Sequence, residues 1–136
     1  MRIFNEIKSS GMKKIISTTA APGAIGPYSQ AVEINGTLYI SGQVGVDPAT
    51  GKMVEGGISE QTGQVLENIR AILLAAGYTM NDVVKSTCLL SDMTDFKAMN
   101  EIYATYYSSD QPARAAFAVK GLPLGALIEI ETVAVK

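Results

Sequence analysis

The sequence contains no histidine, no tryptophan and a single cysteine, Cys88, in 136 residues. The absence of histidine excludes Ser-His-Asp and Cys-His catalytic arrangements, histidine metal sites and general-base chemistry by histidine. A single cysteine excludes an intrachain disulfide and a thiolate metal cluster within one chain. Any proton transfer therefore falls to Glu, Asp, Tyr, Lys, the cysteine or water.

Charge is also sparse, with 11 Lys and Arg against 13 Asp and Glu and a net charge of −2. No run of basic residues supplies the cations that displace counterions from phosphate, so we expect no nucleic-acid partner. No window approaches the roughly 18 apolar residues of a membrane span, and the first residues lack the apolar stretch of a secretory signal. We therefore expect a cytoplasmic protein with no membrane partner.

The apolar residues that are present suffice for one core. Hydrophobic residues make up 47% of the chain, which predicts one globular domain without a linker. Residues 1–11 are more polar than the rest of the chain and precede a second methionine, Met12. We interpret residues 1–11 as an N-terminal extension and residues 12–136 as a single domain.

A hairpin and a helix are predicted in the first half of the chain. Two β-prone runs in "QAVEINGTLYISGQ" flank the dipeptide Asn35-Gly36, which suits a turn whose two central residues both need positive φ. In residues 59–76 apolar side chains recur every three or four positions, with Ser59 placed to cap the start and Gly77 to end the segment. This spacing predicts an amphipathic helix.

The second half predicts a strand, a helix and two further strands. Residues 83–90, "VVKSTCLL", are typical of a strand, and Thr94 is placed to cap the helix after it. The apolar stripe of that helix consists of Phe96, Met99, Tyr103 and Tyr106. Strands are then predicted over residues 113–120 and 127–135. This order favours an α+β sheet with both helices packed on one face.

The last predicted strand has two different faces, because alternate residues of a strand point to opposite sides. One face suits a core and carries Ile128, Ile130, Thr132 and Ala134. The other combines Glu129 and Glu131 with apolar side chains, so it is too apolar for plain solvent and too charged for a plain core. If the helices cover the first face, a second subunit covers the other, and we infer a homo-oligomer.

Arg114 lies inside the apolar run "QPARAAFAV". A buried, unpaired guanidinium costs on the order of several kcal/mol, so Arg114 needs a partner. Its planar fork matches a carboxylate, and the small Ala116 and Ala118 on the same side of the strand leave room for a ligand. From spacing alone, the alternative is an ion pair with Glu129 or Glu131, or a side chain extended to water.

The pattern offers three further candidates. Glu129 and Glu131 lie about 7 Å apart along one strand face, where burial would raise a carboxyl pKa and allow proton exchange with water or substrate; a surface pair of glutamates is the alternative. Tyr28 comes after a Gly-Pro turn that presents it rigidly. Cys88 lies in an apolar strand, and we interpret it as a buried structural thiol.

Several motifs together resemble the Rid family, the reactive intermediate (imine) deaminases also called the YjgF group. They are "IGPYSQA", "SGQ", "AAGYTMNDVVK", "DFKAMNEIY" and "PARAAFAVKGLPLGALIEIETVAV", and the resemblance runs from Lys13 to Val135. It implies a chorismate-mutase-like (ferredoxin-like) fold, a six-stranded mixed sheet with two helices on one face. It also implies a homotrimer with a ligand cleft at each subunit interface.

The activity implied by the resemblance is the hydrolytic deamination of reactive 2-imino and enamine acids, released by pyridoxal-phosphate enzymes, to 2-keto acids and ammonia. The family uses no metal and no cofactor, so none is expected here. Two alternatives stay open: a module that binds a small carboxylate such as a 2-keto acid without turnover, and an endoribonuclease activity ascribed to some relatives.

The resemblance also assigns roles to residues. Arg114 would clamp the substrate carboxylate, and Glu129 would hold or activate water near the imine. The other side chains expected to line the cleft are Tyr28, from the neighbouring subunit, Ser41 and Asn100. Ala116 stands where many members have a cysteine; its backbone N–H remains a donor for the substrate carboxylate, while thiol chemistry at this position is lost.

Overall fold

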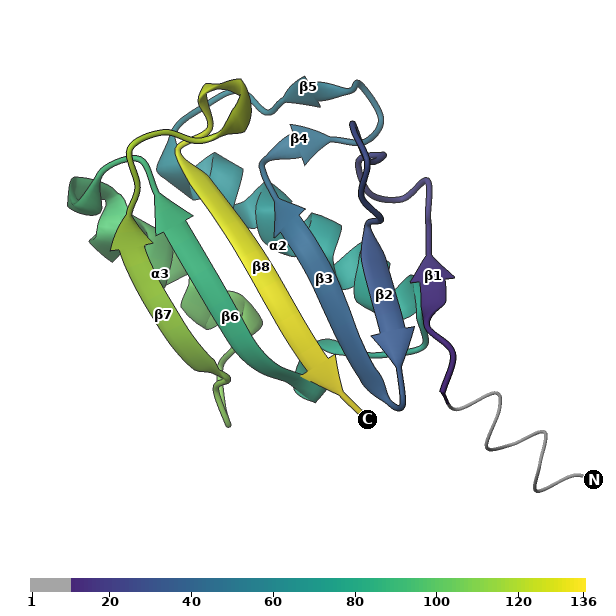
Figure 1. Cartoon of the computed structure of the whole chain (residues 1–136). Helices are drawn as coiled ribbons and strands as arrows, with labels where there is room; N and C mark the ends of the chain where they lie inside the picture. Colours follow the sequence, from purple (N-terminus) through teal and green to yellow (C-terminus); the bar gives the residue numbers. More distant parts are fainter. Residues whose placement is uncertain (1–10) are drawn as a thin grey trace, which may run out of the picture.

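The computed structural model of the chain describes residues 11–136, which fold into one six-stranded sheet with two long helices on one face (Figure 1). The helices are α2 (Ile58–Ala75) and α3 (Phe96–Tyr106). The predicted α+β class is therefore confirmed. The predicted extension, residues 1–11, lies outside the described residues apart from Gly11.

The sheet is mixed, as expected. In spatial order its strands are β1 (Lys14–Ile16), β2 (Ala31–Ile34), β3 (Thr37–Gln43), β8 (Ile128–Val135), β6 (Val83–Leu90) and β7 (Ala113–Ala118). Neighbouring strands are antiparallel except β6 and β7, which are parallel. A small separate hairpin consists of β4 (Val46–Asp47) and β5 (Lys52–Met53). In the described part of the chain, β7 and β1 therefore form the two edges of the large sheet.

The turn between β2 and β3 is the one that the sequence predicts. Asn35 and Gly36 have φ values of 50° and 81°, the combination that a two-residue hairpin turn requires. A side chain at Gly36 is excluded for a second reason, because its Cβ would lie 2.8 Å from the backbone oxygen of Lys136. The chain end thus packs closely against this turn.

Helix α2 ends as predicted but begins differently. Gly77 adopts φ 83°, and the N–H of Tyr78 donates to the Leu73 oxygen at 2.8 Å, which is the Schellman arrangement. Ser59 does not cap the helix. The cap is Gly57, whose N–H donates to the Glu60 carboxylate at 2.8 Å, because this glutamate reaches back over the first turn.

The predicted cap of the second helix is also displaced. Thr94 lies within a short 3₁₀ turn, Met93–Asp95, and its N–H donates to the Asp92 carboxylate at 2.8 Å. Asp92 thus caps the 3₁₀ turn, and α3 begins only at Phe96. The cap moves because Asp92 accepts the Thr94 N–H and begins a 3₁₀ turn ahead of the helix, so that Thr94 lies inside this turn.

The core lies between the sheet and the helices, and the two-faced last strand is confirmed. Along β8 the side chains at 128, 130, 132 and 134 are buried, while those between them are half-buried or exposed. Cys88 is fully buried, as expected, and burial raises the pKa of its thiol to about 11. The thiol is therefore protonated and unreactive at neutral pH.

The other face of the sheet carries large apolar side chains that remain exposed in the single chain. Tyr39 and Phe117 are each about half exposed, at 52% and 48%. Monomeric proteins rarely leave such an apolar surface in water, so this open face fits a subunit interface. Separately, within residues 11–136 neither helix combines the length and apolar character needed to cross a bilayer.

Candidate functional site

Arg114 lies on the edge strand β7 with its side chain over helix α3. Its Nη1 donates to Asn100 Oδ1 at 2.7 Å. The guanidinium carbon lies 4.8 Å from the ring centre of Tyr103 and 5.5 Å from that of Phe96, so both rings stabilise the cation. Helix α3 thus orients the guanidinium. Arg114 is exposed, so the expectation that its charge is buried is wrong for the single chain.

The alternative of an ion pair between Arg114 and a glutamate is not realised in the single chain. Arg114 is opposite Ser86 on β6, and Ser86 is opposite Thr132 on β8, both fully buried on the helix side. Glu129 and Glu131 belong to the alternate positions of β8 and lie on the open face. Since the sheet separates them, Arg114 reaches neither carboxylate, and among the described residues it forms no salt bridge.

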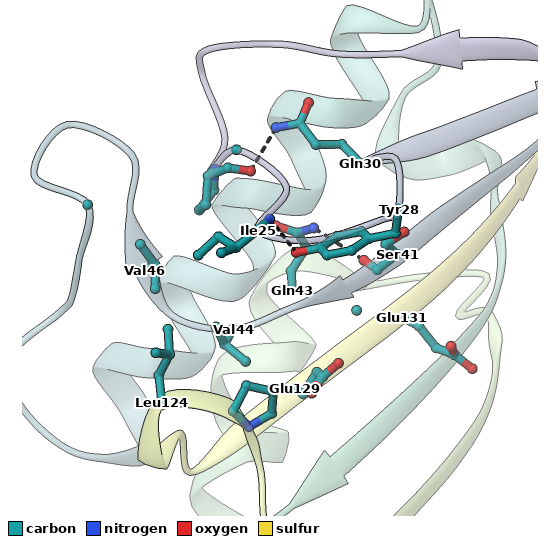
Figure 2. A pocket seen from close by; sticks show the side chains of 15 residues that line it. Ile25, Tyr28, Gln30, Ser41, Gln43, Val44, Val46, Leu124, Glu129 and Glu131 are labelled. Carbon is teal, nitrogen blue, oxygen red and sulfur yellow. Dashed lines mark hydrogen bonds between the residues drawn. The ribbon is translucent and has the colours of Figure 1, made fainter.

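A pocket of about 640 Å³ lies where β3 ends and β8 begins (Figure 2). It contains three of the side chains expected to form the site, and its lining includes Tyr28, Ser41, Gly42, Gln43, Leu124, Glu129 and Glu131. Two carboxylates and no Lys or Arg occur among the lining residues. The pocket of one chain is therefore electrostatically negative.

Tyr28 is held by the turn that precedes it. Gly26 adopts φ 135°, and its carbonyl accepts a hydrogen bond from the Tyr28 N–H at 2.9 Å. The Tyr28 hydroxyl accepts a hydrogen bond from the N–H of Ile25 at 3.2 Å, so the ring folds back over its own loop, as Figure 2 shows. The predicted rigid presentation of Tyr28 therefore has a physical basis.

The loop before Tyr28 is anchored by Gln30, which sequence analysis overlooked. Gln30 is 4% exposed. Its Oε1 accepts from the Thr18 N–H at 2.7 Å, and its Nε2 donates to the Pro22 carbonyl at 2.8 Å. A buried amide with both ends bonded fixes a loop well, and its place at the end of "GPYSQ" is the signal that was available.

Ser41 is oriented by a single strong hydrogen bond. Its hydroxyl donates to the Ser29 carbonyl at 2.6 Å. Because a hydroxyl has only one hydrogen to donate, Ser41 Oγ is left to accept a hydrogen bond from a ligand. The site at Ser41 is therefore suited to an N–H group rather than to a carbonyl oxygen.

A β-bulge places Gly42 directly against Glu129. Ile40 is opposite Thr132 and Gln43 is opposite Ile130, so two residues of β3 face the single Glu131 on β8, which is the count that defines a bulge. A Cβ added at Gly42 would overlap the Glu129 carboxylate. The absence of a side chain at Gly42 thus lets the Glu129 carboxylate lie where it does, a role that the sequence did not reveal.

Burial in the pocket changes the acidity of the Glu129 carboxyl group. It is half-buried, and this burial, followed by the negative charge of Glu131, raises its pKa above the ordinary value for glutamate. A carboxylate with a raised pKa is a stronger base and exchanges protons with water more readily near neutral pH. The raised pKa is therefore consistent with the proton exchange that is expected at Glu129.

The structure divides the six predicted site residues into two groups. Tyr28, Ser41 and Glu129 line the pocket. Arg114 and Asn100 are joined by a hydrogen bond. Ala116 lies on the same side of β7 as Arg114, half-buried and opposite Cys88. A single chain does not bring the two groups together. Within residues 11–136 no group of three His, Cys, Asp or Glu side chains is placed to hold a metal ion.

The chain is similar in sequence and in structure to known proteins. Residues 18–136 match the family model described as endoribonuclease L-PSP. The 2-iminobutanoate/2-iminopropanoate deaminase of Mus musculus is 56% identical over 128 residues, covering 94% of this chain and 95% of the relative. A Rid-family crystal structure from Yersinia pestis superposes with a TM-score of 0.90 at 48% identity, covering 92% and 100% of the chains. TdcF from E. coli, crystallised with bound serine, gives a TM-score of 0.86 at 40% identity and covers 90% and 98%.

Proposed function

This chain belongs to the endoribonuclease L-PSP (Rid) family, and on that basis we propose that it hydrolyses 2-imino acids and their enamine forms to 2-keto acids and ammonia. One observation carries this function: a named 2-iminobutanoate/2-iminopropanoate deaminase shares 56% of its residues over nearly the full length of both chains. The pocket around Glu129 supplies the chemistry such a reaction needs.

The complete site is formed by two subunits of a homotrimer. The negative pocket needs a cation before it binds an anionic substrate, and Arg114 is an exposed cation already oriented by Asn100. Since the two groups lie on opposite faces of one sheet, the pocket of one subunit meets the Arg114 edge of the next. The exposed apolar open face supports an assembly of this kind, and a head-to-tail contact that closes gives a ring.

The substrate is positioned first. The Arg114 fork donates two parallel hydrogen bonds to the substrate carboxylate, and the backbone N–H of Ala116 adds a third. Ser41 Oγ accepts a hydrogen bond from the N–H of the protonated imine, since its own hydrogen is engaged by Ser29. Tyr28 covers the bound substrate and limits access of bulk water.

The reaction then needs one water molecule and one proton carrier. As the water oxygen bonds to C2 of the iminium, the Glu129 carboxylate takes a water proton, and a 2-amino-2-hydroxy acid forms. Glu129 returns this proton to the amino nitrogen. The C–N bond breaks, C2 becomes a ketone, and the hydroxyl proton passes to the departing ammonia, giving a 2-keto acid and ammonium. Because the iminium carbon is already electrophilic, positioning supplies much of the catalysis.

An endoribonuclease function, which the family description names, fits this pocket poorly. Its lining carries Glu129 and Glu131 without a Lys or Arg, and the chain has no histidine. Two carboxylates repel a phosphodiester, and the sequence offers no basic surface to offset that repulsion. A binding module for 2-keto acids would use the same pocket and differs only in lacking turnover.

The deaminase function is tested by coupling a threonine or serine dehydratase to the purified protein and following the loss of imine against spontaneous hydrolysis. Acceleration in proportion to protein concentration supports the function. Binding of a 2-keto acid without any acceleration would replace the enzyme with a binding module. Cleavage of RNA by a preparation that leaves imines untouched would favour the endoribonuclease.

The two-subunit site predicts complementation between two inactive variants. Arg114→Ala and Glu129→Gln chains, co-expressed with different affinity tags and purified through both, should recover about a third of wild-type activity, because each trimer that carries both tags has one interface in three at which both groups are intact. Each variant alone is the control. If every site lay within one chain, the mixed assembly would be as inactive as its two parents.

Gly42→Ala is predicted to lower kcat at least about tenfold, because the new methyl group displaces the Glu129 carboxylate from the position in which it contacts water. The matched control is Gly23→Ala, at a glycine of the same pocket where an added Cβ has nothing within 4 Å. Steady-state kinetics with both variants test this. Equal rates for the two variants would show that the close approach of Gly42 does not position Glu129.

A further inference from the structure

Leu124 adopts a backbone conformation that is unfavourable for leucine. Its φ and ψ are 60° and 23°, in the left-handed region that non-glycine residues rarely occupy. Its side chain is also 66% exposed. A leucine that is both strained and exposed is not explained by the stability of the fold, and such outliers concentrate at ligand sites.

The turn that carries Leu124 is closed by its own hydrogen bond and is anchored on its C-terminal side. Pro123 precedes Leu124, and its carbonyl accepts from the Ala126 N–H at 3.0 Å. Ala126 is buried, and the N–H of Leu127 donates to the Oε1 of the buried Gln61 at 2.9 Å. These bonds fix the backbone, so Leu124 occupies a defined place instead of sampling many.

That place is in the lining of the catalytic pocket. Leu124 lines it together with the apolar side chains of Ile25, Val44 and Val46, while the polar lining is supplied by Ser41, Gln43, Glu129 and Glu131. In Figure 2 Leu124, Val44 and Val46 lie on one side of Glu129, and Glu131 lies on the other. The pocket therefore has a reacting end and an apolar end.

We propose that Leu124 is a specificity-determining residue that contacts the substrate side chain and favours 2-imino acids with larger apolar side chains over 2-iminopropanoate. This inference rests on the proposed deaminase function. Each methylene group of a substrate that leaves water against an apolar wall is worth roughly three- to fourfold in kcat/KM. The reacting carbon and its carboxylate are handled elsewhere, so Leu124 affects which imine is chosen and not how it is hydrolysed.

The test compares two imines generated by one amino-acid oxidase from alanine and from leucine. The measured quantity is the ratio of kcat/KM for the leucine-derived imine to that for the alanine-derived imine. Leu124→Ala should lower this ratio by roughly five- to tenfold. The matched control is Leu74→Ala, which removes another leucine of similar exposure, 58%, on helix α2 outside this pocket.

A second variant separates selectivity from loop stability. Leu124→Gly removes both the side chain and the left-handed strain, so it should lose the same selectivity while unfolding at a temperature no lower than wild type. An unchanged ratio in Leu124→Ala, or a ratio that falls only together with the unfolding temperature in Leu124→Gly, would overturn the inference while the deaminase function stands. If wild type hydrolyses neither imine, the deaminase function itself fails.

Discussion

Replacing Arg114 with alanine is expected to lower kcat/KM for imine hydrolysis roughly 10²–10⁴-fold, because two charge-assisted hydrogen bonds to the substrate carboxylate are lost together. The pocket then presents only Glu129 and Glu131 to an anionic substrate. Their charges oppose binding once the guanidinium is absent. The effect should therefore be visible in KM as well as in kcat.

The fold should tolerate this change. Arg114 is exposed on an edge strand, and among the described residues its hydrogen-bond partner is the half-buried Asn100. Its removal uncovers the ring of Tyr103 but leaves no buried charge unpaired. Steady-state rates and size-exclusion chromatography of the variant measure both halves of the expectation.

Arg114→Lys is the informative control because it retains the charge and loses the planar fork. An intermediate rate for this variant would separate the contribution of geometry from that of charge. Activity of Arg114→Ala within about tenfold of wild type would contradict the role of the guanidinium as the carboxylate clamp.

Local patterns predicted the parts of the fold that local physics decides. The hairpin at Asn35-Gly36 needed only two residues that accept positive φ, and the end of α2 needed only a glycine at 77. The helix starts were less predictable. Near each of them several side chains are able to accept a free N–H group, and the geometry of the turn decides that Glu60 and Asp92 do so.

Strand β1 was not predicted because three residues carry too short a pattern. It exists through its pairing with β2, where Ile16 is opposite Ala31 and is buried in the core. Pairing of this kind depends on long-range contacts that no short window contains. The hairpin of β4 and β5 is local, and it was missed because two residues in each strand carry too short a pattern.

The candidate site was predictable as a set of residues and not as an arrangement. Alternation along β8 placed Glu129 on the open face correctly. The face of Arg114 depends on the parallel pairing of β7 with β6, which alternation alone does not specify. An ion pair between Arg114 and Glu129 or Glu131, which spacing alone left open, is excluded only once the pairing of these strands is known.

The roles of Gly42 and Leu124 could not be predicted from the sequence for a second reason. The role of Gly42 arises from a bulge between β3 and β8, and a bulge is a property of two strands. The left-handed backbone of Leu124 lies in a turn that is closed by the Ala126 N–H and held at Leu127 by Gln61, which is 66 positions before Leu127 in the chain. In both cases the chemistry of the site depends on backbone geometry that only the folded chain reveals.

Glu129→Gln is expected to lower kcat roughly 10²–10⁴-fold with a much smaller effect on KM. The amide has nearly the same shape but takes no proton from water, whereas Arg114 continues to bind the substrate carboxylate. The rate of wild type should fall as the pH drops through the raised pKa of Glu129, since only the ionised carboxylate acts as a base. The residual rate of Glu129→Gln should lack this acidic limb.

The raised pKa of Glu129 also affects the stability of the fold. The ionised form that catalysis needs is the form that destabilises the folded chain. Burial and the charge of Glu131 make ionised Glu129 less favourable in the folded chain than in the unfolded chain. The unfolded chain therefore releases this proton first, and folding loses stability as the pH rises from the ordinary glutamate pKa to the raised one. Glu129→Gln should thus be at least as stable as wild type at pH 7, with a difference that shrinks at acidic pH.

A further variant, Glu131→Gln, tests the cause of the raised pKa of Glu129. It removes the charge of Glu131, which is the second cause, and leaves the Glu129 carboxylate in place. The acidic limb of its kcat profile should move to lower pH, by less than the full shift, since burial of Glu129 is the larger cause. Denaturant unfolding and pH–rate profiles of the two variants measure these effects. The acidic limb of the kcat profile could stay at the same pH in Glu131→Gln and persist in Glu129→Gln. This result would assign the base to a different group.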